Sequence, residues 1–153
     1  MKKILVSGCL YGWHCRYDAV DLPCTDERFL KWKAEGRLIP VCPEVFGGLK
    51  TPRPDSQRLG DKVIACTGKD VTVEYEAGAQ EALRLAQKDG VAFAILKEDS
   101  PSCGSKYIYD GTFTDTKIKG YGRAAQLLAE AGFRVFDEDE LDMAEKYLAE
   151  AES

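Results

Sequence analysis

Short apolar runs alternate with longer segments of helical periodicity along this chain of 153 residues, and this alternation constrains the fold most strongly. The apolar runs are typical of buried strands, and they occupy residues 2–8, 37–41, 91–96 and 133–136. The helical segments carry capping residues or a closing glycine, and they occupy residues 25–36, 70–89, 121–132 and 137–151. Strands that alternate with helices favour a parallel sheet covered on both faces. We therefore expect an α/β fold, a Rossmann-like three-layer sandwich with a mainly parallel sheet and helices on both faces, formed by a single domain over residues 1–153.

Residues 42–60 interrupt this pattern, because they carry three of the six prolines and three glycines. We expect a long loop there, and a loop of this length inside a compact domain usually has a function or moves. A short strand is expected at residues 62–66. Pro40 weakens the strand predicted at residues 37–41, because proline removes one backbone donor.

The formal net charge of −5 argues against broad binding of nucleic acid, which depends on an excess of Lys and Arg, and it disfavours tRNA as a partner. No apolar run approaches the length of a membrane span. The N-terminal sequence MKKILVSGC resembles a lipoprotein signal, but only Ile4, Leu5 and Val6 precede its small residues. Because an export signal needs about 7–15 apolar residues, we expect a cytoplasmic protein.

Six cysteines are the main chemical feature of the chain. In a cytoplasmic protein of this length, cysteines serve metal binding or catalysis more often than disulfide formation. Cys9, Cys42 and Cys103 each follow a predicted strand, and the carboxyl ends of parallel strands meet at the sheet edge where ligands bind. We therefore expect these three thiols to lie at one site. The other cysteines are Cys15, which could replace one of the three because it lies close to Cys9, and Cys24 and Cys66, which are interpreted as small apolar side chains.

The residues alone leave three kinds of site open. The sequence has no C-x-x-C pair, so the usual zinc-ribbon and ferredoxin patterns are absent, but three thiolates with the single histidine, His14, could hold zinc in a structural metal module. Cys103 could instead carry a persulfide in a cysteine-based sulfurtransferase, which would require an exposed thiolate and a nearby base. Three thiolates without a fourth protein ligand would leave one position of an iron centre open to a substrate sulfur.

Three segments resemble the motifs of the thiouracil desulfidase family, long catalogued as a domain of unknown function. They are CLYGWHCRYD at residues 9–18, PVCPEVFGGLKTPR at residues 40–53 and KEDSPSCGSKYIYDGTF at residues 97–113. The CPEV-x-GGL and SPSCG motifs are specific, and the resemblance extends from Ile4 to about Glu138.

This resemblance implies a Rossmann-like domain that holds one 4Fe-4S cluster through three cysteine ligands, Cys9, Cys42 and Cys103. The fourth iron would be free to bind the sulfur of a small thiolated pyrimidine. The family reaction converts thiouracil into uracil and releases hydrogen sulfide without net redox change. The substrate could be thiolated at position 2 or 4, and it could be a base or a nucleotide.

The resemblance also assigns roles to two side chains near these cysteines. Glu44 matches the family's acid/base glutamate, which would activate water, and Ser100 matches a serine close to the substrate carbon. On the residues alone, Glu44 could instead pair with Arg53 or Lys50. Ser100 could likewise be a turn residue before Pro101, which is a common role for serine.

Further side chains are expected around the substrate. Arg53, between two prolines, could bind a substrate phosphate or brace its loop, and Ser102 could share the role of Ser100. The residues predicted to contact the substrate are Arg16, Tyr17, Asp18, Arg53 and Ser102.

Overall fold

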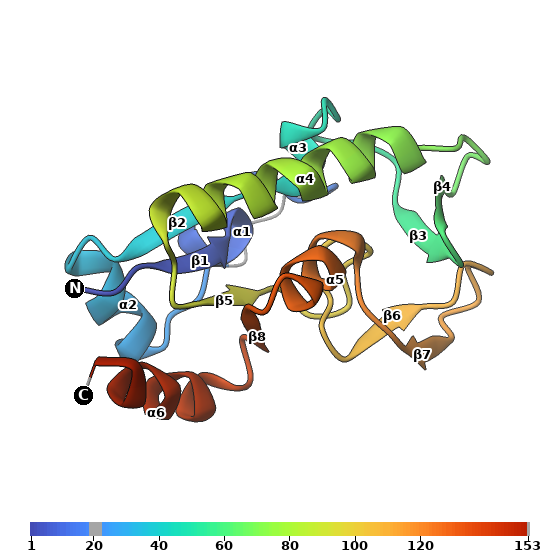
Figure 1. The fold of residues 1–153 in the computed structure, drawn as a ribbon. Coiled ribbons are helices and arrows are strands. Elements are labelled where there is room, and N and C mark those ends of the chain that lie inside the picture. Colours follow the sequence, from blue (N-terminus) through green and yellow to red (C-terminus); the bar gives the residue numbers. More distant parts are fainter. Residues whose placement is uncertain (19–22, 153) are drawn as a thin grey trace.

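The computed structural model describes residues 1–18 and 23–152, and its centre is a four-stranded parallel sheet (Figure 1). The strands are β1 (Ile4–Ser7), β2 (Leu38–Val41), β5 (Phe93–Leu96) and β8 (Arg134–Asp137), and their order in the sheet is β2-β1-β5-β8. All three pairings between neighbours are parallel. The four apolar runs predicted as strands are therefore confirmed.

Four helices cover the two faces of this sheet. Helices α2 (Glu27–Ala34) and α6 (Leu141–Glu152) pack on one face, and α4 (Thr72–Asp89) and α5 (Arg123–Glu130) pack on the other. The alternation of side chains along a strand explains this division: in β1, Ile4 and Val6 join the core with α2 and α6, whereas Leu5 joins the core with α4 and α5. The predicted α/β three-layer sandwich is confirmed.

The strand order creates a topological switch point between β1 and β5, which is where parallel sheets of this kind bind ligands. From β1 the chain passes to β2 on one side and then crosses back over β1, through α4, to reach β5. The carboxyl ends of β1 and β5 therefore flank a topological switch point. Pro40 is compatible with β2 because β2 is an edge strand.

Among the described residues, six short elements lie outside this framework. They are α1 (Gly8–Tyr11), α3 (Pro43–Phe46), the antiparallel pair β3 (Ser56–Leu59) and β4 (Lys62–Ala65), and the antiparallel pair β6 (Tyr107–Tyr109) and β7 (Lys117–Lys119). The strand predicted at residues 62–66 is confirmed as β4, but the prediction of one continuous loop over residues 42–60 is wrong, since that segment contains α3 and β3. Pro43 occupies the first turn of α3, where a missing N–H costs no helical hydrogen bond.

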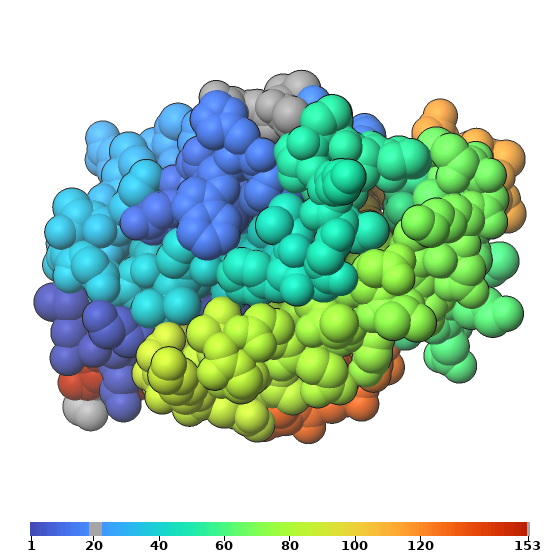
Figure 2. All heavy atoms as spheres, turned by 90° about the horizontal axis from the view of Figure 1, so that it is seen from above, coloured from blue at the N-terminus to red at the C-terminus, as the bar shows by residue number. Residues whose placement is uncertain are grey.

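Two glycines allow α3 to lie directly against α4, and Figure 2 shows the teal spheres of the α3 segment packed along the green spheres of α4. A Cβ atom added at Gly78 would lie 1.6 Å from the carbonyl oxygen of Pro43, and one added at Gly47 would lie 1.9 Å from the carbonyl oxygen of Glu74. The backbone of α3 is therefore fixed on α4 without intervening side chains. Within the described residues, no helix is long and apolar enough to cross a membrane.

Candidate active site

The three predicted cysteines lie at neighbouring strand ends. Cys9 lies in α1, directly after β1, Cys42 lies between β2 and α3, and Cys103 lies in the loop that follows β5. All three are 5–8% exposed and line one cavity of about 360 Å³. Cys15 is also 8% exposed and lines the same cavity. The prediction that the sheet brings these thiols to one edge is confirmed.

The surroundings of Cys9 and Cys103 disfavour their thiolates in the absence of a cation. Burial and the neighbouring Cys42 raise the pKa of Cys9 to about 11. Burial also raises the pKa of Cys103, and the Glu44 carboxylate and the other thiols act in the same direction. A hydrogen bond with Cys15 lowers the pKa of Cys42. A bound cationic centre removes a proton from each thiol that it ligates, so this buried donor set suits a soft metal centre.

Cys9, Cys15, Cys42 and Cys103 all line this cavity. Among the residues that the structure describes, no group of three or more His, Cys, Asp or Glu side chains is arranged to hold a metal ion. A single zinc ion requires every thiolate sulfur at about 2.3 Å from one centre, whereas the cysteine ligands of an iron–sulfur cluster are bound to different irons. His14 is exposed and is not part of the cavity wall.

Glu44 enters the cavity from the first turn of α3 and forms an ion pair with Arg53. The side chains of Glu44 and Arg53 are 13% and 6% exposed, so water screens this pair only weakly. Lys50, the other cation that could have paired with Glu44, contributes its backbone carbonyl, which accepts a hydrogen bond from Arg53 Nη1 at 3.1 Å.

Ser100 faces the second oxygen of the same carboxylate. Ser100 Oγ lies 3.5 Å from Glu44 Oε1, and it accepts hydrogen bonds from the backbone N–H groups of Ser102 at 3.1 Å and Cys103 at 3.0 Å. Because two amides occupy its acceptor side, the hydroxyl proton is directed toward Glu44. The turn role and the contact with Glu44 are therefore both present in one side chain.

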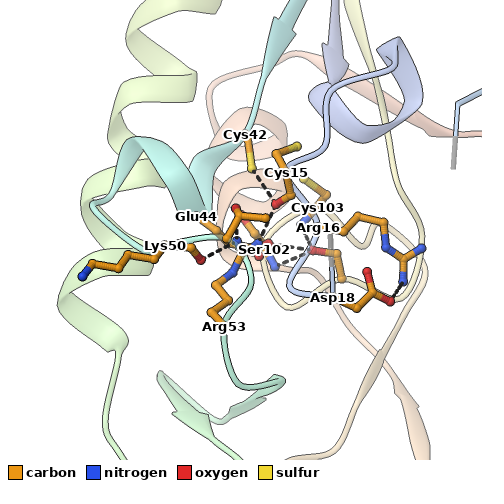
Figure 3. Close-up of polar contacts among 11 residues, drawn as sticks. Cys15, Arg16, Asp18, Cys42, Glu44, Lys50, Arg53, Ser102 and Cys103 are labelled. Carbon is orange, nitrogen blue, oxygen red and sulfur yellow. Dashed lines mark hydrogen bonds and ion pairs between the residues drawn. The ribbon is translucent and has the colours of Figure 1, made fainter. Parts of the chain in front are cut away.

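The residues predicted to contact the substrate divide into two groups. Arg16, Tyr17 and Arg53 line the cavity, whereas Asp18 and Ser102 do not belong to its described wall. Asp18 binds Arg16 at 3.3 Å. Ser102 is fully buried behind the wall, where a Cβ atom added at Gly122 would lie 2.4 Å from its carbonyl carbon. Figure 3 shows Arg16 and Asp18 on one side of the site and the Glu44–Arg53 pair on the other.

The structure adds cavity residues that the sequence prediction missed. They include Ser7, Asp55, Ser56, Gln57, Tyr75, Lys97, Glu98, Asp99, Tyr109 and Asp115. Lys97, Glu98 and Asp99 directly follow β5, so the rule that ligands bind beyond strand ends could have identified them. Tyr75 comes from the buried face of α4 and Asp115 from the connection between β6 and β7, and neither position carries a local signal in the sequence.

Glu98 closes the loop that carries Ser100 and Cys103. Its Oε1 accepts hydrogen bonds from the backbone N–H groups of Asp99 at 3.1 Å, Lys106 at 3.3 Å and Tyr107 at 3.2 Å. Both ends of the loop are thus bound to one carboxyl oxygen. Burial raises the pKa of Glu98, and a hydrogen bond with the Asp137 carboxyl raises it further.

Comparison with known proteins agrees with this architecture. A family model described as 2-thiouracil desulfurase matches residues 4–140. YbbK of Bacillus subtilis (strain 168), described as uncharacterized, is 41% identical over 149 residues, which cover 91% of this chain and 97% of YbbK. The solved structure of TudS, a 4Fe-4S-dependent thiouracil desulfidase, is similar with a TM-score of 0.95 and 44% identity, and the match covers 97% of this chain and 99% of the TudS chain. This protein belongs to the 2-thiouracil desulfurase family.

Proposed function

We propose that this protein is a 4Fe-4S-dependent thiouracil desulfidase that converts a thiolated uracil into uracil and releases hydrogen sulfide. The observation that carries the proposal is the meeting of three buried thiols with the Glu44–Ser100 pair in one cavity. The 44% identity to TudS over nearly the whole chain supports it. We extend the proposal to residues 1–153 acting as one domain.

Cys9, Cys42 and Cys103 are the proposed ligands of the cluster, because each follows a different strand of the sheet and each is buried in the cavity wall. When bound, a cluster with three protein ligands supplies an iron with a free coordination position, a Lewis acid with affinity for the sulfur of the substrate. Cys15 lies beside Cys42, and its carbonyl oxygen accepts a hydrogen bond from Cys42 Sγ at 3.6 Å. We assign Cys15 a supporting position rather than a ligand role.

Glu44 and Ser100 would carry out the proton transfers. Water adds to the carbon of the C=S bond, and Glu44 accepts a proton from that water. Ser100, whose hydroxyl lies 3.5 Å from Glu44 Oε1, orients the water or passes the proton on. The carbon–sulfur bond breaks, and the sulfur leaves with two protons as hydrogen sulfide. Substrate and water thus give uracil and hydrogen sulfide, and no electrons are gained or lost overall.

The surroundings of Cys103 disfavour the alternative of a persulfide sulfurtransferase. A persulfide carrier requires an exposed, reactive thiolate. Cys103 is only 5% exposed, and burial raises its pKa, so the thiol is held in its neutral form. A structural zinc module is also less suitable, because such sites are closed by four ligands, whereas these thiols border an open cavity of about 360 Å³.

We propose that the enzyme works in the cytoplasm, because free thiols and an iron–sulfur cluster suit its reducing conditions.

The cations of the cavity wall bear on the size of the substrate. Arg16, Arg53 and Lys97 line the cavity, and each pairs with a carboxylate of the protein. We therefore propose a small thiolated pyrimidine as the substrate and not tRNA.

The test is turnover by anaerobically reconstituted protein. We expect uracil or its nucleotide to appear from at least one of 2-thiouracil, 4-thiouracil and the 4-thio nucleotides. No such product from any of these compounds would refute the proposal. Glu44→Ala is expected to retain iron and lose activity by about 100- to 10,000-fold, the range typical of general acid–base groups. Full activity of this variant would remove the assigned role of Glu44.

A further inference from the structure

The guanidinium of Arg53 is committed to the protein itself. Nη1 donates to the carbonyl oxygen of Lys50 and to Thr51 Oγ1, each at 3.1 Å. Nη2 donates to the carbonyl oxygen of Cys15 at 2.9 Å and to Glu44 Oε2. All four N–H bonds of the terminal nitrogens therefore have acceptors, and none remains for a substrate phosphate.

Arg53 also binds the segment of the cavity wall that runs from Cys15 to Tyr17. Its backbone N–H donates to the carbonyl oxygen of Tyr17 at 2.7 Å, so the segment from Cys15 to Tyr17 is bound at both ends. Its Nε is buried and has no hydrogen-bond partner among residues 1–18 and 23–152. Of the two roles that the sequence left open for Arg53, the contacts match the bracing role.

We infer that Arg53 is a positioning residue that orients the Glu44 carboxylate for proton transfer. Glu44 has two oxygens, and Arg53 binds Oε2 while Oε1 faces Ser100. A glutamate side chain rotates about three bonds, so one anchored oxygen restricts where the other can point. The inference rests on the proposed function, since it assigns Arg53 a task only if Glu44 handles the proton.

The size of the effect follows from the geometry required for proton transfer. Displacement of a reacting group by about 1 Å can lower the rate by about 100-fold. Without Arg53, the carboxylate loses its anchor at Oε2, and the Ser100 contact, already at 3.5 Å, is too weak to hold it alone. We therefore expect Arg53→Met to lower kcat by about 100-fold and to change KM by less than about threefold.

A double-mutant cycle separates this role from simple bracing of the loop. It compares the anaerobically prepared wild type, Arg53→Met, Glu44→Gln and the double variant. If Arg53 acts through Glu44, Arg53→Met lowers kcat by less than about threefold in the Glu44→Gln background. Bracing alone predicts the same loss in both backgrounds, and that result would overturn the inference. A raised KM with unchanged kcat would also overturn it, because Arg53 would then bind substrate.

The cycle also distinguishes failure of the inference from failure of the proposed function. Wild-type activity in Glu44→Gln would overturn both the role of Glu44 and this inference. If Glu44→Gln has low activity, but Arg53→Met lowers kcat as much in the Glu44→Gln background as in the wild type, only the inference is overturned. The melting temperatures of the same four proteins give a readout independent of turnover. We expect non-additive changes for this contacting pair, and additive changes would contradict the contact.

Three further variants serve as controls for this experiment. Arg84 and Glu81 form an exposed pair on α4, so Arg84→Met and Glu81→Gln should leave kcat and iron content unchanged. If Arg53→Met does not fold, Arg53→Lys keeps the charge but cannot reproduce the forked contacts. We expect Arg53→Lys to retain iron and to lose kcat by at least about 10-fold. Wild-type kcat in this variant would overturn the inference.

Discussion

Gly78→Ala adds one methyl group at the contact through which α4 supports α3, and we expect it to disturb the active site from a distance. The new Cβ would lie 1.6 Å from the carbonyl oxygen of Pro43 and 2.4 Å from its carbonyl carbon. A carbon–oxygen contact requires about 3.3 Å, so the two backbones must separate by roughly 1.7 Å. Cys42 and Glu44 adjoin Pro43 on either side, so they move with it.

The sign of the stability change makes this prediction decisive. Helix propensity alone predicts that alanine in place of glycine within α4 stabilises the protein by about 1 kcal/mol. The overpacked contact instead predicts a loss of about 3 kcal/mol, which corresponds to a melting temperature about 6–12 °C lower. The displacement of Glu44 predicts a loss of kcat of about 100-fold.

Calorimetry, iron content and turnover of the purified variant test these expectations. Gly120→Ala is the matched control, because its Cβ would meet only the end of the Ile108 side chain at 3.3 Å, which can move aside. The reasoning is refuted if Gly78→Ala is as stable as the wild type or more stable and keeps full iron content and activity.

The remaining predictions concern the thiols, Ser100 and Glu98. Serine in place of any one of the three proposed cysteine ligands should abolish stable iron binding, measured by iron analysis, whereas serine at the exposed Cys66 should leave the iron content unchanged. Ser100→Ala should retain iron but lower kcat by about 100-fold or more, and a variant as active as the wild type would remove the hydroxyl from the mechanism. The pKa of Glu98 is raised in the folded state, so between about pH 4.3 and this raised pKa the folded protein binds more protons than the unfolded chain, and the free energy of unfolding should fall as pH rises through this range. Urea unfolding at several pH values should show a weaker fall in Glu98→Gln, and an identical slope in both proteins would contradict the assignment.

The central sheet was predictable because its strands are local, apolar and regularly separated by helices. The short elements around the site were not, because tertiary contacts determine them. Helix α3 has only four residues, and its position depends on Gly78, which lies far away in the sequence. Strand β3 includes Ser56 and Gln57, which have no apolar alternation, and it exists through its pairing with β4.

The position of the three cysteines was predictable from the sequence, whereas the partner of Glu44 was not. Cys9, Cys42 and Cys103 follow strands whose carboxyl ends must share an edge of the sheet, so their proximity follows from the fold class. The partner of Glu44 could not be chosen in advance, because Lys50 and Arg53 both follow it in the same loop and Lys50, which is the nearer in sequence, is not the residue that pairs with it. Only the folded loop brings the Arg53 guanidinium onto the carboxylate and turns the Lys50 carbonyl toward that same guanidinium.

The most direct test of the proposed chemistry is anaerobic turnover of thiouracil in water enriched in oxygen-18. Water is the proposed source of the new carbonyl oxygen, so mass spectrometry should find oxygen-18 in the uracil at the carbon that lost sulfur. Sulfide should appear in an amount equal to uracil, without any added reductant or oxidant. Sulfur retained on a protein cysteine as a persulfide, or uracil without the heavy isotope, would contradict hydrolytic desulfuration at this site.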